Sequence, residues 1–242
     1  MFFPEVLTEK ELERRKKSMG SYHFSMQYLN EPIDDETATF KRSDIIRKDW
    51  EMVKDRPINW YLSVDPSYEG PYSDFAALVV AGMDYQRDIY VRHVVRQKMT
   101  YADIINKMFD LDSQFNPKQI LLETIGTKSL EHELKNEQKR RGRWLKVYPI
   151  KSQPKSKEER IRGLAPYYEF GHIFHVQQSP QLDELEYELL HFPFGKHDDT
   201  IDALANILDV AIPPNANMST AEAQDKKIKY VAFKPRSPST GY

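Results

Sequence analysis

The sequence predicts an α/β fold in which helices flank a mixed central sheet, an antiparallel meander followed by parallel strands. Two observations predict it. The apolar run of residues 60–65 and the β-rich runs of residues 74–84 and 88–100 are separated only by turn-rich segments, as in an antiparallel meander. Residues 119–150 read as strand, helix and strand, which is the order of a parallel β-α-β unit.

Local patterns define the individual elements. The first strand, residues 60–65, stops at Asp65, which a proline follows. Apolar residues then recur about once per turn from Thr100 until Asn116-Pro117 breaks the pattern, so a helix is expected there. The sequence also predicts helices over residues 127–142, 157–170, 180–190 and 198–210, and strands over residues 119–123, 145–150 and 172–176.

The amino-acid composition restricts the possible metal sites and nucleophiles, but it says little about binding partners. The 35 Lys and Arg residues nearly balance the 37 Asp and Glu residues, so the overall charge neither favours nor excludes a nucleic-acid partner. The chain has no cysteine, which excludes disulfides, thiolate zinc sites and cysteine nucleophiles. Any metal must bind oxygen or imidazole, which favours Mg²⁺ or Mn²⁺. No segment reaches the roughly 20 apolar residues of a membrane span, so a soluble intracellular protein is expected.

Three carboxylates lie where a sheet would bring them together. Asp65 ends the first strand, Glu123 ends a parallel strand, and Asp199 begins the last helix. Ligands of α/β sheets gather at the ends of strands. Hydrolysis of a phosphodiester needs an activated water and a stabilised leaving oxygen, and two divalent cations held by carboxylates supply both. We therefore expect these acids to bind metal, with Asp65 as the ligand shared by both ions.

The last acidic motif, Lys196 to Asp202, leaves alternatives open. Asp198 and Asp199 stand where a helix begins, so either could instead cap the helix or interact with its dipole. Asp199 and Asp202 are one turn apart and share a helix face, where two like charges repel unless a cation lies between them. For Asp65, the alternative is a turn residue before proline.

A basic stretch runs from Lys135 to Arg162 with few acids in it. Such a stretch is expected where a protein contacts the phosphate backbone of DNA or RNA, and no base-reading motif accompanies it. The alternative is a solvated helix face, especially near residues 135–143. The candidate DNA-binding residues are Lys139, Arg140, Arg141, Arg143, Lys155, Lys157 and Arg160.

Several of these segments resemble a known family. The pieces are YLSVDPS with a following SDFAALVV, then QILLE, KSKEERI and KHDDTIDALA, and the resemblance covers residues 1 to about 210. They are similar to the nuclease domain of the large terminase subunits of tailed bacteriophages, the viral genome-packaging ATPases, whose fold is ribonuclease H-like. The resemblance implies that Asp65, Glu123 and Asp199 bind two Mg²⁺ or Mn²⁺ ions, with Asp198 and Asp202 as auxiliary ligands.

The resemblance also implies an activity and its setting. The expected protein is an endonuclease that cuts double-stranded concatemeric viral DNA during packaging, in the cytoplasm of the infected bacterial host. Its expected partners are DNA, an ATPase domain, the portal and the small terminase subunit, with no membrane. No GxxxxGK[ST] phosphate loop occurs in the sequence, so the ATPase motor is not in this chain, which is expected to be a separately made nuclease domain or a fragment.

Three regions are expected along the chain. Residues 1–55, with a helix over residues 8–18, resemble the family's connector from the ATPase domain; residues 56–211 form the nuclease domain; residues 212–242 form a flexible tail. Two other functions remain open. One is a junction resolvase or transposase-like nuclease of the same fold, which would prefer four-way junctions. The other is a non-catalytic module that docks on the portal.

Overall fold

The computed structural model describes residue 14 and residues 38–66, 75–124, 128–150, 155–179 and 181–215. The predicted helix over residues 8–18, apart from residue 14, and the predicted tail beyond residue 215 lie outside the described residues. Within the described part, no helix combines the length and apolarity needed to cross a membrane.

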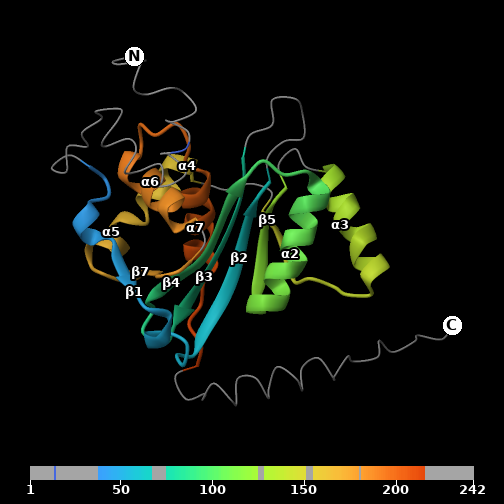
Figure 1. Cartoon of the computed structure of the whole chain (residues 1–242), viewed down its shortest axis with the longest axis horizontal. Helices are drawn as coiled ribbons and strands as arrows, with labels where there is room; N and C mark the ends of the chain where they lie inside the picture. The colour runs from blue at the N-terminus through green and yellow to red at the C-terminus, as the bar shows by residue number, and fades with distance from the viewer. Residues whose placement is uncertain are drawn as a thin grey trace.

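A seven-stranded mixed sheet forms the centre of the molecule (Figure 1). Its strands run in the order β1-β7-β4-β3-β2-β5-β6. Neighbours β2, β3 and β4 are antiparallel, whereas β5 is parallel to β2, β6 to β5, and β7 to both β4 and β1. The predicted meander and parallel half are therefore confirmed. The strands are β1 (Ile46–Lys48), β2 (Ile58–Asp65), β3 (Ala76–Asp84), β4 (Ile89–Gln97), β5 (Gln119–Glu123), β6 (Val147–Ile150) and β7 (Ile173–Val176).

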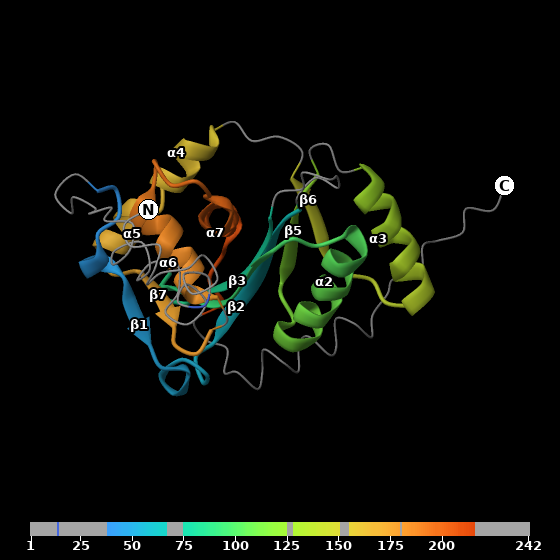
Figure 2. The same ribbon diagram turned by 45° about the horizontal axis from the view of Figure 1, so that its top comes forward.

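Helices cover both faces of this sheet. Helices on one face, the sheet itself and helices on the other face give three layers (Figure 2). The first face carries α2 (Tyr101–Phe115) and α3 (Lys128–Arg141). The second carries α4 (Lys157–Arg162), α5 (Ala165–Glu169), α6 (Leu182–His191) and α7 (Asp199–Val210), and two short 3-10 helices, η2 (Arg42–Asp44) and η3 (Trp50–Met52), flank β1.

The centre of the sheet is fully buried. All nine residues of β3 are buried, because the strand has neighbours on both sides and helices over both faces. Helix α7 packs across β3 and β2, and residues 200–207 of this helix are all buried. Burial all round is typical of a helix inside a core rather than on a surface. Asp202, in the first turn of α7, is therefore held against the sheet.

The predicted helix over residues 157–170 is two helices, α4 and α5, in the structure. Proline lacks a backbone N–H and its ring clashes with the carbonyl four residues earlier, so it is tolerated only in a helix's first turn. Pro166 occupies that place in α5. Helix α4 begins at a capping box, in which Ser156 accepts from the backbone of Glu159 and the Glu159 carboxylate accepts from Ser156.

Residues 38–55 contribute to the same sheet and core, although the sequence resembles a connector there. Strand β1 pairs in parallel with β7, and Phe40 and Val53 are fully buried. The Arg47 guanidinium donates to both oxygens of Glu186 on α6, at 2.9 and 2.7 Å. Residues 38–55 are therefore bound to β7 by strand pairing and to α6 by an ion pair.

Candidate metal centre

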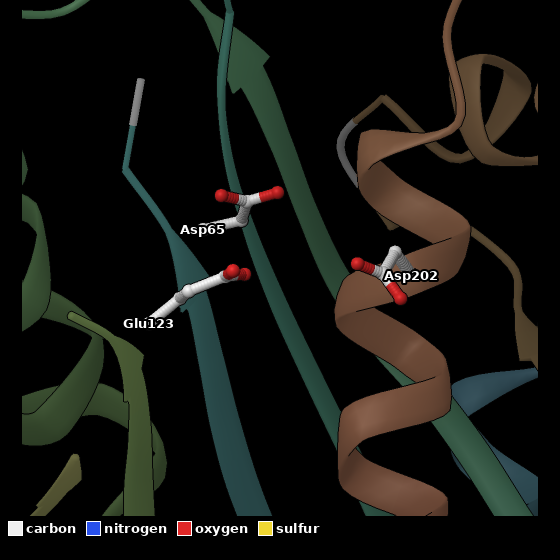
Figure 3. Close-up of side chains that lie close together, drawn as sticks. All are labelled: Asp65, Glu123 and Asp202. Atoms are coloured by element: carbon white, nitrogen blue, oxygen red, sulfur yellow. The ribbon is translucent and has the colours of Figure 1, made fainter. Parts of the chain in front are cut away.

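Two parallel strands deliver two acids to one edge of the sheet. Asp65 is the last residue of β2, and Glu123 is the last residue of β5. The two strands are in register, Val64 opposite Leu122, so the residue that follows each lies beside the other. Figure 3 shows these two side chains on their neighbouring strands, with Asp202 facing them from α7.

One oxygen from each of Asp65, Glu123 and Asp202 lies within 4.8 Å of the other two. Carboxylate oxygens are the ligands that Mg²⁺ and Mn²⁺ prefer, and three of them around one space can hold such an ion. Asp202 is buried and the other two acids are partly buried. The donor set and its enclosure therefore fit a divalent cation.

Burial and mutual repulsion act on these acids. Burial, followed by the charge of Glu123, raises the pKa of Asp65 to about 8, although Lys157 opposes the rise. Burial also raises the pKa of Asp202 to about 6, against the opposing charges of Lys157 and Arg160. Acids crowded in this way gain from a cation between them, and such perturbed carboxyls are typical of functional sites.

The other two acids of the last motif, Asp198 and Asp199, do not belong to the group of three whose oxygens lie within 4.8 Å of one another. The Asp198 carboxylate is 2.7 Å from Lys157 Nζ. Asp199 Oδ1 is 3.5 Å from the same Nζ, and Asp199 Oδ2 is 3.8 Å from Arg96 Nε. The structure thus brings Asp202, rather than Asp199, to Asp65 and Glu123. A role for Asp198 or Asp199 as a ligand stays a prediction.

The two basic residues of α4 that were expected to bind DNA face these acids. Lys157 contacts Asp198 and Asp199, and Arg160 donates to the Asp202 carboxylate at 2.7 and 2.8 Å. The Arg160 side chain is only 9% exposed. These residues therefore compensate the acids of α7, and their contact with DNA stays a prediction.

The remaining candidate DNA-binding residues lie mostly around α3. Arg140 and Arg141 both donate to Glu137, and Arg143 pairs with Asp112. Lys139 and Lys155 are exposed. Helix α3 covers the face of the sheet opposite to α7. Contact between this group and DNA also stays a prediction.

A buried glutamate that sequence reasoning did not single out holds the start of α7. Glu188 on α6 accepts hydrogen bonds from the Thr200 backbone N–H at 2.8 Å, the Thr200 hydroxyl at 2.6 Å and the Ile201 N–H at 3.2 Å. Asp198, at the N-cap position, makes no side-chain cap bond. Arg96 Nε of β4 lies 3.1 Å from the other Glu188 oxygen. An acid within a helical pattern gives no signal for such a role.

Comparison with known proteins gives matches in structure alone. No protein-family model matches the sequence, and no curated protein is detectably similar to it. The human cytomegalovirus terminase nuclease domain, soaked with manganese and bound to an inhibitor, superposes with a TM-score of 0.52 at 12% identity, covering 72% of this chain and 96% of that one. The large terminase nuclease from thermophilic phage G20c superposes with a TM-score of 0.51 at 17% identity, covering 70% and 96%. The chain has the ribonuclease H-like fold of terminase nuclease domains.

The terminase-nuclease fold also agrees with the predicted resemblance. A second structure of the cytomegalovirus domain, soaked with manganese alone, gives a TM-score of 0.52 at 10% identity, covering 72% of this chain and 95% of that one. In the present chain, the carboxyl ends of β2 and β5 and the first turns of α7 meet at one place of this fold, and the cluster of three acids lies there.

Proposed function

We propose that this chain is a metal-dependent endonuclease that cuts double-stranded concatemeric viral DNA during genome packaging, in the cytoplasm of the infected bacterial host. The observation that carries the proposal is the cluster of Asp65, Glu123 and Asp202, whose oxygens lie within 4.8 Å of one another on a terminase-nuclease fold. A phosphodiesterase of this type needs carboxylates gathered at one point and little further side-chain chemistry.

Each acid has a proposed role. Asp65, Glu123 and Asp202 hold two Mg²⁺ or Mn²⁺ ions, with Asp65 as the shared ligand. Bound divalent cations supply the charge that activates a water molecule and neutralises the departing oxygen. The strand ends fix the backbone positions of Asp65 and Glu123, and the packed helix α7 fixes that of Asp202.

The proposed function as a packaging nuclease also implies partners. We propose double-stranded DNA as substrate, and an ATPase domain, the portal and the small terminase subunit as the other parts of the packaging machine. The exposed lysines Lys139 and Lys155 are proposed to contact DNA phosphates, which makes binding indifferent to sequence and sensitive to salt.

The decisive experiment is plasmid cleavage by the purified chain. Supercoiled DNA should be nicked and linearised with Mn²⁺ or Mg²⁺ and left intact in EDTA. Linear duplex and a four-way junction serve as parallel substrates, and the proposal expects no preference for the junction. A protein that cuts nothing with either cation, or that cuts equally well in EDTA, would be incompatible with the proposed function.

Cation affinity should rise with pH between about pH 6 and pH 8. The Asp65 carboxyl, with a pKa of about 8, must lose its proton before its oxygen binds a cation, so each rise of one pH unit towards this value should strengthen binding about tenfold. Above pH 8 the affinity should level off. Calorimetric titration of Mg²⁺ in two buffers of different ionisation enthalpy counts the released protons. Affinity that is flat over this range, with no proton release, would contradict the prediction.

A further inference from the structure

A buried guanidinium from α4 contacts the Asp202 carboxylate. Arg160 Nη2 donates to both oxygens of Asp202, at 2.7 and 2.8 Å, and Arg160 Nε lies 3.2 Å from Oδ1. The side chains are 9% and 3% exposed, so water screens this pair little. The capping box at Ser156 fixes the start of α4, and α4 packs against α7. The contact is therefore built into the fold.

The geometry of this contact restricts what Asp202 can do. A single nitrogen within hydrogen-bonding distance of both carboxylate oxygens occupies the notch between them, the position from which a cation would bind both oxygens at once. Asp202 then has only its outer lone pairs left for a metal. The guanidinium also brings a positive charge to within hydrogen-bonding distance of a proposed cation ligand.

The same contact opposes a role for Arg160 on a DNA phosphate. Nε and Nη2 are bound to Asp202, and Nη1 donates to the Lys155 carbonyl at 3.3 Å. To reach a phosphate, the guanidinium would have to leave a buried carboxylate, which is costly because that carboxylate would lose its hydrogen-bonded ion pair. Arg160 is thus directed at the acid cluster.

We propose that Arg160 is an internal counter-ion that competes with a divalent cation for Asp202 and so lowers the cation affinity of the site. This inference rests on the proposed metal site. Arg160 stabilises the Asp202 carboxylate when no cation is bound, and a cation must overcome both the charge of Arg160 and its hydrogen bonds to Asp202. The residue sets the cation concentration at which the site fills.

The test compares Arg160→Gln with wild type. Glutamine keeps a hydrogen-bond donor near Asp202 but removes the charge. Mg²⁺ affinity is measured by calorimetry and by thermal-shift titration at pH 8.5, well above the pKa of Asp202 in wild type. Arg160→Gln should bind Mg²⁺ about tenfold more tightly and should melt at a lower temperature in EDTA.

Arg162→Gln is the matched control, because Arg162 lies on the same helix and pairs with Glu158 at the exposed surface. Its Mg²⁺ affinity should stay within about twofold of wild type. Arg160→Lys restores the charge without the planar fork, and its affinity should return to within about threefold of wild type.

The outcomes separate this inference from the proposed function. Unchanged or weaker Mg²⁺ binding by Arg160→Gln would overturn the inference alone, since the wild-type site would still bind. If Arg160→Gln is unfolded in EDTA but folds on addition of Mg²⁺, as judged by circular dichroism, competition is supported. If it stays unfolded at saturating Mg²⁺, Arg160 supports the site rather than competing for it, and the inference fails. A wild-type chain that binds no divalent cation would overturn both proposals.

Discussion

Asparagine in place of Asp65 or Asp202 should slow metal-dependent plasmid cleavage by about a thousandfold. A bound divalent cation contributes several kcal/mol to the stabilisation of a phosphodiester transition state, and about 1.4 kcal/mol corresponds to a factor of ten. Asparagine has nearly the same shape but only one oxygen and no charge, so the loss reports on ligation. Both variants should also lose Mg²⁺ binding in calorimetry, while circular dichroism shows a folded protein.

Asp199→Asn is the control that makes this prediction discriminating. Asp199 is one turn from Asp202 on the same helix, but its oxygens lie 3.5 Å from Lys157 and 3.8 Å from Arg96, and it is not among the three acids whose oxygens lie within 4.8 Å of one another. Its replacement should slow cleavage by less than about tenfold and leave Mg²⁺ binding measurable. If instead Asp199→Asn abolishes cleavage while Asp202→Asn remains active, Asp199 is the ligand, as the sequence alone suggested, and the proposed ligand set is wrong.

Most of the fold could be predicted from the strand pattern of the sequence. Short apolar runs bounded by turn residues are consistent with buried strands, and this pattern correctly predicted β2 and β5 with their terminal acids. The order of strand, helix and strand after residue 119 correctly gave the parallel half. Strand β1 was not predicted from the sequence, because three residues of mixed polarity at a sheet edge show no hydrophobic periodicity.

The choice between Asp199 and Asp202 could not be made from helical periodicity. The two residues share a face, so the pattern places them together, yet only packing decides how deep each lies. Helix α7 is buried on nearly all sides, and its apolar residues therefore do not mark one face. The positions of the two carboxylates depend instead on their tertiary partners, Arg160 for Asp202 and Arg96 for Asp199. Both pairings join residues far apart in the sequence, so the local pattern does not reveal them.

A second consequence of this packing is the dependence of α7 on Glu188. Glu188→Ala should lower the free energy of unfolding by about 3 kcal/mol, because it leaves two buried N–H groups and a buried hydroxyl without an acceptor and weakens the pairing of Arg96. For a chain of this size the melting temperature should fall by roughly 10 °C.

Urea unfolding in EDTA measures this loss without a contribution from bound cation. Glu184→Ala is the control, since Glu184 lies on the same helix, is 31% exposed and is 3.5 Å from the same arginine; it should cost less than about 1 kcal/mol. Equal losses in the two variants would mean that Glu188 acts only as one more partner of Arg96. A larger loss in Glu188→Ala, together with weaker Mg²⁺ binding, would show that the buried carboxylate holds the first turn of α7, and with it Asp202, against the ends of β2 and β5.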